Sequence, residues 1–356
     1  MKKITQQLVF CCLLPLAVAW AGGEGQWHIV ATRNEIPNRG ECGMAAWEGR
    51  LYLVGGGALP TQVYDPATAL WQQRAAPPQN INHFQAVALG GRIYVLSALT
   101  TGPYPNQPNI EKPLIYDIAT DKWTAGNPLP AGRNRAAAGA AVYNGRLLLV
   151  AGIQQGHFSG TTNQFDQYDP VSNSWTPLPD APHIRDHCSA AVLGDKLYVA
   201  GGRNTSYHEP DNFMSFFKKT VLEVDCYDFK SGQWSTLAAR LPQGSGGGAL
   251  VALQGKLFYM GGERATDTEP NMPRNDVYWL EPGTGTEWKN ASALREPRNG
   301  MSAAVMNDTI YVFGGAGPKQ APLPDGPLHE AMQKRPAPAK EVSDKPSPLE
   351  MFTFTK

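Results

Sequence analysis

Four arginines stand at the same distance from a recurring turn, and their side chains could hold an anion. Counting ten residues back from the turn in each of six similar segments gives Arg39, Ile81, Arg135, Arg185, Ser245 and Arg298. A guanidinium group can bind a carboxylate through two parallel hydrogen bonds. The four arginines could therefore surround an acidic ligand, or they could join segments by covering main-chain carbonyls. The sequence leaves both roles open.

Other polar residues lie near these arginine positions. His83 and His187 each come two residues after the shared position in their own segments, and Tyr207 and Glu209 lie in a long variable stretch, residues 203–219. We predict that these side chains contact the same ligand. His187 and the adjacent Cys188 lack the ligand spacing of a metal motif. No metal and no other cofactor is predicted.

Three cysteines, Cys42, Cys188 and Cys226, remain if the chain is cut after residue 21. Cys42 and Cys188 share a register but belong to the first and fourth of the six segments. A disulfide needs Cα atoms within about 7 Å of one another, so we expect neither a bridge nor a shared zinc ion between these two. An odd number of cysteines in an exported protein leaves at least one free thiol or an intermolecular pair.

The arginine positions belong to a unit that is written six times along the chain. Each copy has a run of small residues, a turn, a strand that usually ends in a glycine pair, a variable loop, a strand that often ends in Tyr-Asp, and a tryptophan. The tryptophans are Trp27, Trp71, Trp123, Trp175, Trp234 and Trp288, at intervals of 44, 52, 52, 59 and 54 residues. A period of about 50 residues with four short strands is typical of a β-propeller blade.

The unit resembles the kelch repeat, and the resemblance extends from about Trp27 to Phe354. It implies an all-β, six-bladed kelch β-propeller. Trp27 precedes the first complete unit, and no tryptophan follows the strand near residues 351–354. We therefore predict that the N-terminal strand completes the last blade, which removes an unpaired sheet edge. In kelch proteins that dock acidic peptides, similarly placed arginines line the pocket, so the resemblance implies the same for Arg39, Arg135, Arg185 and Arg298.

A second resemblance is to the secreted bacterial sialic acid mutarotases, which interconvert the anomers of N-acetylneuraminate. The segments that carry it are Gly262-Glu263, Arg274-Asn275-Asp276-Val277 and the Phe-rich stretch 212–227. The resemblance implies that Glu263 moves the proton of the anomeric hydroxyl and that Arg274 holds the substrate carboxylate. The gap between this Glu and this Arg is longer here than in that family.

The N-terminus has the layout of a secretory signal peptide. Lys2 and Lys3 precede an apolar run over residues 8–20, and small residues surround the expected cut after Ala21. We predict export to the periplasm or the cell exterior and a single propeller domain over residues 22–356. Residues 318–348, rich in Pro and Lys, are predicted to be a disordered insertion in the sixth blade.

The charge balance argues against two classes of partner. The chain carries 31 basic and 31 acidic side chains, which gives no electrostatic reason to expect nucleic acid or an anionic membrane surface. No second long apolar run predicts a membrane span. We therefore expect an exported binding module for an anionic glycan or an acidic peptide or protein, contacted through its loop-rich face. The alternative is a sugar anomerase, a sialic acid mutarotase (N-acetylneuraminate epimerase).

Overall fold

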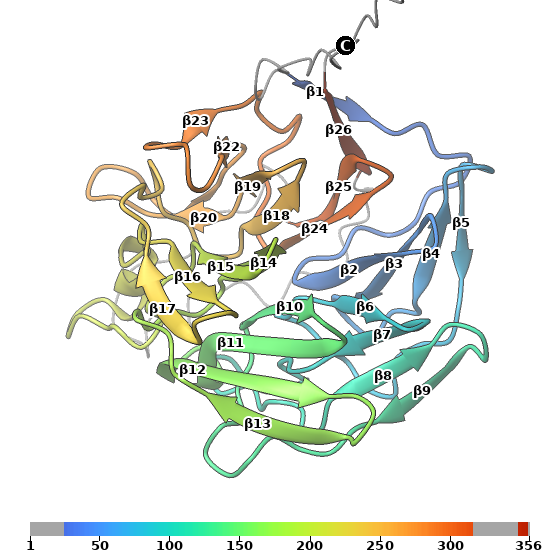
Figure 1. Ribbon diagram of the computed structural model, residues 1–356, viewed down its shortest axis with the longest axis horizontal. Coiled ribbons are helices and arrows are strands. Elements are labelled where there is room, and N and C mark those ends of the chain that lie inside the picture. Colours follow the sequence, from blue (N-terminus) through green and yellow to red (C-terminus); the bar gives the residue numbers. More distant parts are fainter. Residues whose placement is uncertain (1–24, 316–347, 355–356) are drawn as a thin grey trace, which may run out of the picture.

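Six four-stranded antiparallel sheets surround one axis in the computed structural model, which describes residues 25–315 and 348–354 (Figure 1). The strand nearest the axis comes first in blades 1 to 6, and the chain then runs outwards. The predicted six-bladed, all-β propeller is confirmed. The one helical element in the described residues is the 3₁₀ helix η1 (Phe213–Lys218) in a loop of blade 4.

The first three blades follow the chain order without interruption. Blade 1 contains β2 (Cys42–Trp47), β3 (Arg50–Gly55), β4 (Gln62–Asp65) and β5 (Leu70–Gln73). Blade 2 contains β6 (Val87–Leu89), β7 (Arg92–Val95), β8 (Leu114–Asp117) and β9 (Lys122–Ala125). Blade 3 contains β10 (Gly139–Tyr143), β11 (Arg146–Gln155), β12 (Ser159–Asp169) and β13 (Ser174–Leu178). Blade 3 has the longest strands because β11 and β12 continue into the hairpin between them.

The last three blades include two irregularities. Blade 4 contains β14 (Ser189–Leu193), β15 (Lys196–Ala200), β16 (Asp225–Asp228) and β17 (Gln233–Thr236). Blade 5 contains β18 (Ala249–Leu253), β19 (Lys256–Met260), β22 (Val277–Leu280) and β23 (Lys289–Asn290), and its long loop forms a separate ribbon, β20 (Glu263–Arg264) with β21 (Met272–Pro273). Blade 6 contains β24 (Met301–Met306), β25 (Thr309–Gly314), β26 (Glu350–Phe354) and β1 (Gly25–Ile29).

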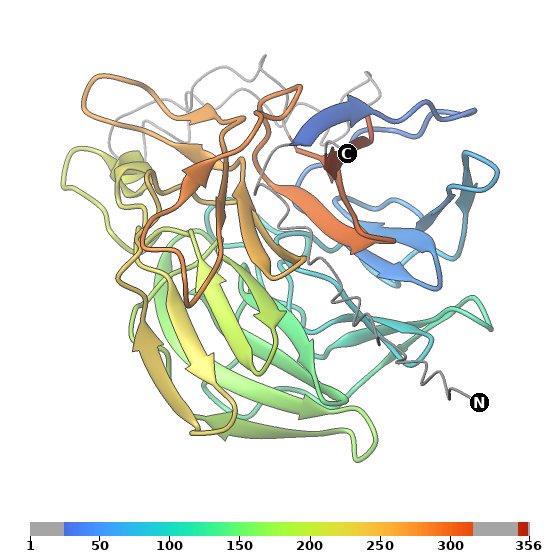
Figure 2. The same cartoon turned by 45° about the horizontal axis from the view of Figure 1, so that its top comes forward.

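The N-terminal strand β1 closes the ring, as predicted. It pairs antiparallel with β26, and Trp27 lies opposite Phe352 (Figure 2). Trp27 is buried, its ring centroid is 5.4 Å from that of Phe352, and its indole N–H donates to the carbonyl of Ser292 at 3.0 Å. The two ends of the described chain are therefore held in one sheet.

The recurring aromatic residues join each blade to its neighbour. In four blades a tyrosine of the third strand lies opposite a tryptophan of the fourth, with ring centroids 4.9 to 5.3 Å apart. The indole N–H groups of five tryptophans donate to a main-chain carbonyl of the preceding blade: Trp123 to Ala75, Trp175 to Asn127, Trp234 to Pro179, Trp288 to Ala239 and Trp27 to Ser292. Trp27 thus makes for blade 6 the indole hydrogen bond that the tryptophans of blades 2 to 5 make with their preceding blades.

A closed ring of main-chain hydrogen bonds surrounds the axis at the start of the inner strands. The residue two positions after each arginine-equivalent position donates its N–H to the carbonyl of its counterpart in the preceding blade, over 2.6 to 2.9 Å. All six residues have positive φ, between 50° and 66°: Glu41, His83, Ala137, His187, Gly247 and Gly300. We call these the axial residues. They line the narrow central channel.

Several sequence predictions concern residues outside the described ranges. The predicted signal peptide, residues 1–21, lies there, as do residues 318–347 of the predicted insertion. Cys42, Cys188 and Cys226 are buried, unpaired thiols, so the expected lack of a bridge between the first two is confirmed. No helix of the described residues is long and apolar enough to cross a membrane.

We expect Trp27→Ala to lower the free energy of unfolding by about 3–5 kcal/mol, because it removes a buried aromatic side chain from the strand that closes the ring. Urea unfolding followed by tryptophan fluorescence measures this loss. Ile29→Ala is the matched control, since Ile29 lies in the same strand and is 56% exposed. Equal effects of the two substitutions would contradict the importance of the closing contact.

Candidate functional site at the channel mouth

The four predicted ligand-binding arginines are buried inside the blades. Their relative exposure is 0% for Arg39, Arg135 and Arg185 and 1% for Arg298. Each donates to the carbonyl sixteen residues further along the chain, in the second strand or directly after it: Gly55, Ala151, Gly201 and Gly314. The Ser245 hydroxyl donates to the corresponding carbonyl of Gly261. A contact shared by five blades belongs to the scaffold.

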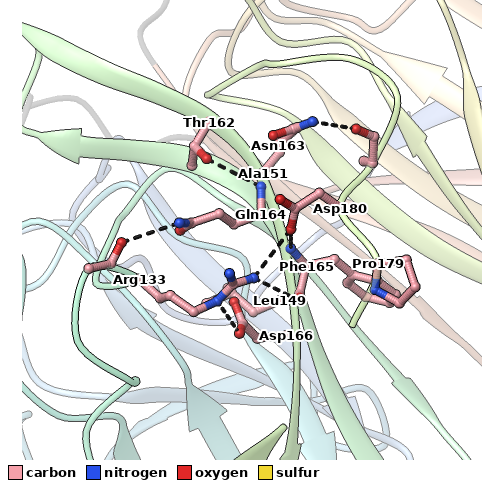
Figure 3. A network of polar contacts seen from close by, with 12 residues as sticks. Arg133, Leu149, Ala151, Thr162, Asn163, Gln164, Phe165, Asp166, Pro179 and Asp180 are labelled. Atoms are coloured by element: carbon pink, nitrogen blue, oxygen red, sulfur yellow. Dashed lines mark hydrogen bonds and ion pairs between the residues drawn. The ribbon is translucent and has the colours of Figure 1, made fainter. Parts of the chain in front are cut away.

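Three of these arginines also pair with a buried acid of the third strand. Arg135 lies 2.7 Å from Asp166, Arg185 lies 2.7 Å from Asp225, and Arg298 lies 2.9 Å from Glu350. Figure 3 shows the other oxygen of the Asp166 carboxylate accepting a hydrogen bond from Arg133, which also approaches Asp180. Of the two roles that the sequence left open for these arginines, the geometry therefore favours the structural one. Their burial leaves no guanidinium surface for a ligand to reach.

Three histidines from different blades meet at the mouth of the channel. His83 and His187 are axial residues of blades 2 and 4, and His157 lies at the tip of the hairpin between β11 and β12. The Nε2 atoms of His83 and His157 are 3.1 Å apart, and one ring nitrogen from each of the three histidines lies within 4.8 Å of the other two. His157 and His187 are buried. Burial lowers the pKa of His187 well below its usual range, and Arg203 and His83 lower it further.

Each of the three imidazoles is held through its other nitrogen. His187 Nδ1 lies 2.6 Å from an Asp186 oxygen, His83 Nδ1 lies 2.6 Å from the side-chain oxygen of Asn82, and His157 Nδ1 lies 3.1 Å from that of Gln107. Asp186 is itself fixed, because it accepts from Thr161 and from both the hydroxyl and the N–H of Thr205. These oxygens accept hydrogen bonds, so the Nδ1 atoms donate and the Nε2 atoms face one another.

Two carboxylates and one arginine lie beside the histidines. Glu41 is the axial residue of blade 1, and its Oε1 is 3.8 Å from His83 Nε2. The pKa of the Glu41 carboxyl is raised to about 7, first by burial and second by the nearby Glu263 carboxylate, while Arg203 acts in the opposite direction. Glu263 is buried and accepts from Arg203 at 2.7 Å and from the amides of Asn271 and Asn299. The mouth therefore combines anionic and cationic groups.

The guanidinium of Arg274 pairs with acids other than Glu263. It approaches Glu269 at 3.4 Å and Asp276 at 3.6 Å, and the main chain of Arg274 pairs with that of Arg298. The guanidinium against Glu263 belongs to Arg203, at the end of the second strand of blade 4. Arg203 also lies over the rings of Phe216 and Phe217, 5.2 and 4.6 Å from their centroids.

Loops of three blades cover this side of the channel with aromatic side chains. Tyr104 of blade 2 lies 5.4 Å from the ring of His157 and 6.3 Å from that of Phe213 in η1. His208 stacks on Phe213 at 4.3 Å and bonds to the carbonyl of Phe158 in blade 3. We call this group the aromatic cover. Phe158 itself is 39% exposed.

Tyr207 and Glu209 lie at the outer side of the aromatic cover. The ammonium of Lys219 is 4.2 Å from the centroid of the Tyr207 ring, and the Tyr207 hydroxyl lies 3.5 Å from Glu209 Oε1. Glu209 is exposed. The structure thus brings His83 and His187 together at the mouth, places Tyr207 and Glu209 on the loop above, and separates all of them from the four buried arginines.

Sequence reasoning missed three residues of the site: Glu41, His157 and Arg203. Glu41 stands two residues after the arginine-equivalent position of its segment, as His83 and His187 do in theirs. The alignment of the six segments could therefore have identified it. Arg203 directly follows the glycine pair of blade 4, as Glu263 follows that of blade 5. His157 has no counterpart in the other blades, because, in the part of the chain that the structure describes, only in blade 3 do the second and third strands extend into a hairpin, and spacing could not place it.

Comparison with known proteins agrees with the architecture. A model of the Kelch motif matches residues 134–182, and a model described as the KLHDC2/KLHL20/DRC7 Kelch-repeats domain matches residues 179–315. The chain belongs to the kelch-repeat family. The Kelch-like protein terF of Aspergillus terreus is 29% identical over 77% of this chain and 57% of its own length.

Two further comparisons concern length and fold. Human Kelch-like protein 23 is 27% identical over 74% of this chain and 43% of its own length, so the kelch chain spans about half the length of these curated relatives. The solved structure of YjhT superposes with a TM-score of 0.66 at 16% identity, covering 83% of this chain and 95% of YjhT. At this identity the likeness shows a common fold alone.

We expect Arg135→Ala to lower the free energy of unfolding by about 3–5 kcal/mol, because it breaks the fully buried ion pair with Asp166 and leaves that carboxylate with Arg133 alone. Chemical denaturation of the kelch propeller measures the loss. Arg92→Ala is the control, since the Arg92–Asp117 pair is solvent-exposed and should change stability by about 1 kcal/mol or less. An unchanged stability of Arg135→Ala with lost ligand binding would restore the ligand-binding role.

Proposed function

We propose that this kelch propeller is an exported binding module that takes an anionic glycan or an acidic peptide at the channel mouth. The observation that carries the proposal is the convergence of polar side chains from several blades beneath the aromatic cover. Loops placed on a rigid scaffold are where binding residues concentrate. Isolated bridges such as Asp186 to Arg203 and Gly246 to Glu263 tie these loops to the starts of the inner strands, which gives the mouth a fixed shape.

The dimensions of the channel favour a ligand that lies on the mouth. The space lined by the axial residues has a volume of about 60 Å³, whereas pockets for drug-sized molecules measure roughly 300–1,000 Å³. An ion or a few waters fit inside this space, and a sugar or peptide does not. A larger ligand would therefore rest on the loops, with one group directed toward the histidines.

Exposed groups around the mouth supply contacts for an anionic ligand. Lys219 is exposed, and the side chain of Arg274 is 22% exposed to solvent. Both cations can therefore reach a carboxylate of the ligand. Phe158 presents an exposed ring at the hairpin tip, and aromatic faces provide large contact areas for rings and side chains. Export is supported by the basic start and apolar run of residues 2–21.

A screen of sialylated, sulfated and neutral glycans together with acidic and basic peptides tests this function. We expect binding to anionic members, weakened about tenfold when Lys219 and Phe158 are both replaced by alanine, a loss that corresponds to about 1.4 kcal/mol. The control is Arg50→Ala, because Arg50 is exposed at the turn between β2 and β3, away from the mouth. Equal binding of neutral and anionic members, or equal losses in both variants, would contradict the proposal.

Sialic acid mutarotase activity is the second candidate, and the pairing of Glu263 with a guanidinium favours it. A carboxylate that moves the anomeric proton beside an arginine that holds the substrate carboxylate is the pair this reaction requires. At this mouth the arginine nearest Glu263 is Arg203. Arg274 lies one residue beyond the β21 strand that pairs with Glu263, and its main-chain N–H donates to the carbonyl of Gly262, the residue before Glu263.

NMR observation of freshly dissolved N-acetylneuraminate distinguishes the two functions. If the chain is a mutarotase, the anomers equilibrate faster than in buffer, and Glu263→Gln removes most of the acceleration because the amide cannot take up the proton. Asn204→Ala, outside the carboxylate's contacts, should retain it. Equilibration at the buffer rate would exclude the activity for this sugar and leave the binding function standing.

A further inference from the structure

The arrangement of histidines at the channel mouth has the form of a metal site. His83 and His187 flank Ala137 in the ring of axial residues, because the N–H of Ala137 donates to His83 and its carbonyl accepts from His187. Alanine in blade 3 leaves free the space that a longer side chain would fill. His157 enters this space from the hairpin above, and the three ring centroids lie 4.6 to 5.2 Å apart.

The imidazoles are oriented as metal-bound histidines are. A histidine that binds a metal through one nitrogen usually donates the other N–H to a carboxylate or an amide or main-chain oxygen, which fixes the ring and its tautomer. Here all three Nδ1 atoms have such oxygens, from Asp186, Asn82 and Gln107. The Nε2 atoms of His83 and His157 face each other, and one ring nitrogen of each of the three histidines lies within 4.8 Å of the other two.

A second observation points to a ligand at that point. His187 is 5% exposed, and its Nε2 atom is buried with no hydrogen-bond partner among the described residues. A buried polar atom without a partner costs about 1–3 kcal/mol. In addition, the Nε2 atoms of His83 and His157 lie 3.1 Å apart, a separation that one bound cation between them would explain. One ion coordinated by three nitrogens satisfies both conditions.

We propose that His83, His157 and His187 bind one divalent transition-metal ion, with Zn²⁺ as the best match. Imidazole nitrogen suits zinc, copper, nickel and iron, and three histidines with an open fourth position form a known type of zinc coordination. Zn–N bonds of about 2.0–2.1 Å place tetrahedral nitrogens about 3.4 Å apart. The Nε2 atoms of His83 and His157, 3.1 Å apart, are already close to that separation, and the ring nitrogen of His187, within 4.8 Å of theirs, reaches it by moving about 1.4 Å or less.

The fourth position of this site faces the channel and Glu41. An ion there would hold a water molecule or an anionic group of a ligand lying on the mouth, and the Glu41 carboxylate, 3.8 Å from His83 Nε2, is near enough to accept a proton from such a water. The three histidines and their outer contacts do not depend on the proposed function, so we expect the metal site whether or not that function is correct.

Metal binding is tested with the full chain after removal of bound ions by a chelator. Calorimetric titration with Zn²⁺ should show one tight site, and Co²⁺ should give the visible absorption of a tetrahedral complex. We expect His157→Ala and His187→Asn each to weaken Zn²⁺ binding about 100-fold or more, and Asp186→Asn about 10- to 100-fold, since loss of an outer contact has effects of that size. His28→Asn, which removes an exposed histidine of β1, should change nothing.

Variants that remain folded distinguish the loss of a metal ligand from the loss of the propeller itself. Unfolding transitions of the apo variants show whether each substitution leaves the propeller intact, and His157→Ala, at a hairpin tip, is the variant expected to do so. Absence of a stoichiometric site for Zn²⁺, Co²⁺, Ni²⁺ and Cu²⁺ at micromolar concentration would overturn the proposal. Tight Zn²⁺ binding that persists in both His157→Ala and His187→Asn would overturn it equally, because the ion would then lie elsewhere in the chain.

Discussion

The closed ring of six main-chain hydrogen bonds at the axis sets the geometry of the whole mouth. Each axial residue donates to its counterpart in the preceding blade and has positive φ. In four of the six positions the residue is not glycine, and a left-handed conformation costs such residues roughly 1–2 kcal/mol each. The ring therefore requires support from outside the axis. The hydrogen bonds of the ring join main-chain atoms alone, so the side chain of an axial residue can differ from blade to blade.

That support comes from the buried residues two positions earlier in the chain. In five blades this residue bonds to the equivalent carbonyl, in the second strand of its own blade or directly after it, and the contact fixes the segment that leads into the axial residue. Breaking a buried charge pair is strongly destabilising. The arginines thus hold the mouth in shape from within the blades, while residues beside them in sequence carry the exposed chemistry.

The sequence was sufficient for the fold and for part of the site. Six tryptophans at intervals near 50 residues predicted the blades, and Trp27 predicted the closing strand, because strand pairing follows a regular repeat. The same register grouped His83 with His187. The register of the repeat does not show that the arginine side chains are buried in the blades while the side chains two residues later reach the axis. The sequence therefore left two roles open for the arginines. His157 depends on the length and bend of one hairpin, and the partner of Glu263 depends on how two loops meet; neither follows from a repeat.

The chemistry of the mouth arises where the repeat is broken. Blades 1, 2 and 4 place Glu41, His83 and His187 at the axis, whereas blades 5 and 6 place Gly247 and Gly300 there. A Cβ atom at Gly300 would collide with the Glu41 carboxylate, and one at the neighbouring Gly246 would lie 2.9 Å from the Arg203 guanidinium. These glycines therefore make room for charged groups of other blades. A fully symmetric ring would have no such space, so the asymmetry of the axial residues is what allows an acid, an arginine and three imidazoles to occupy one small volume.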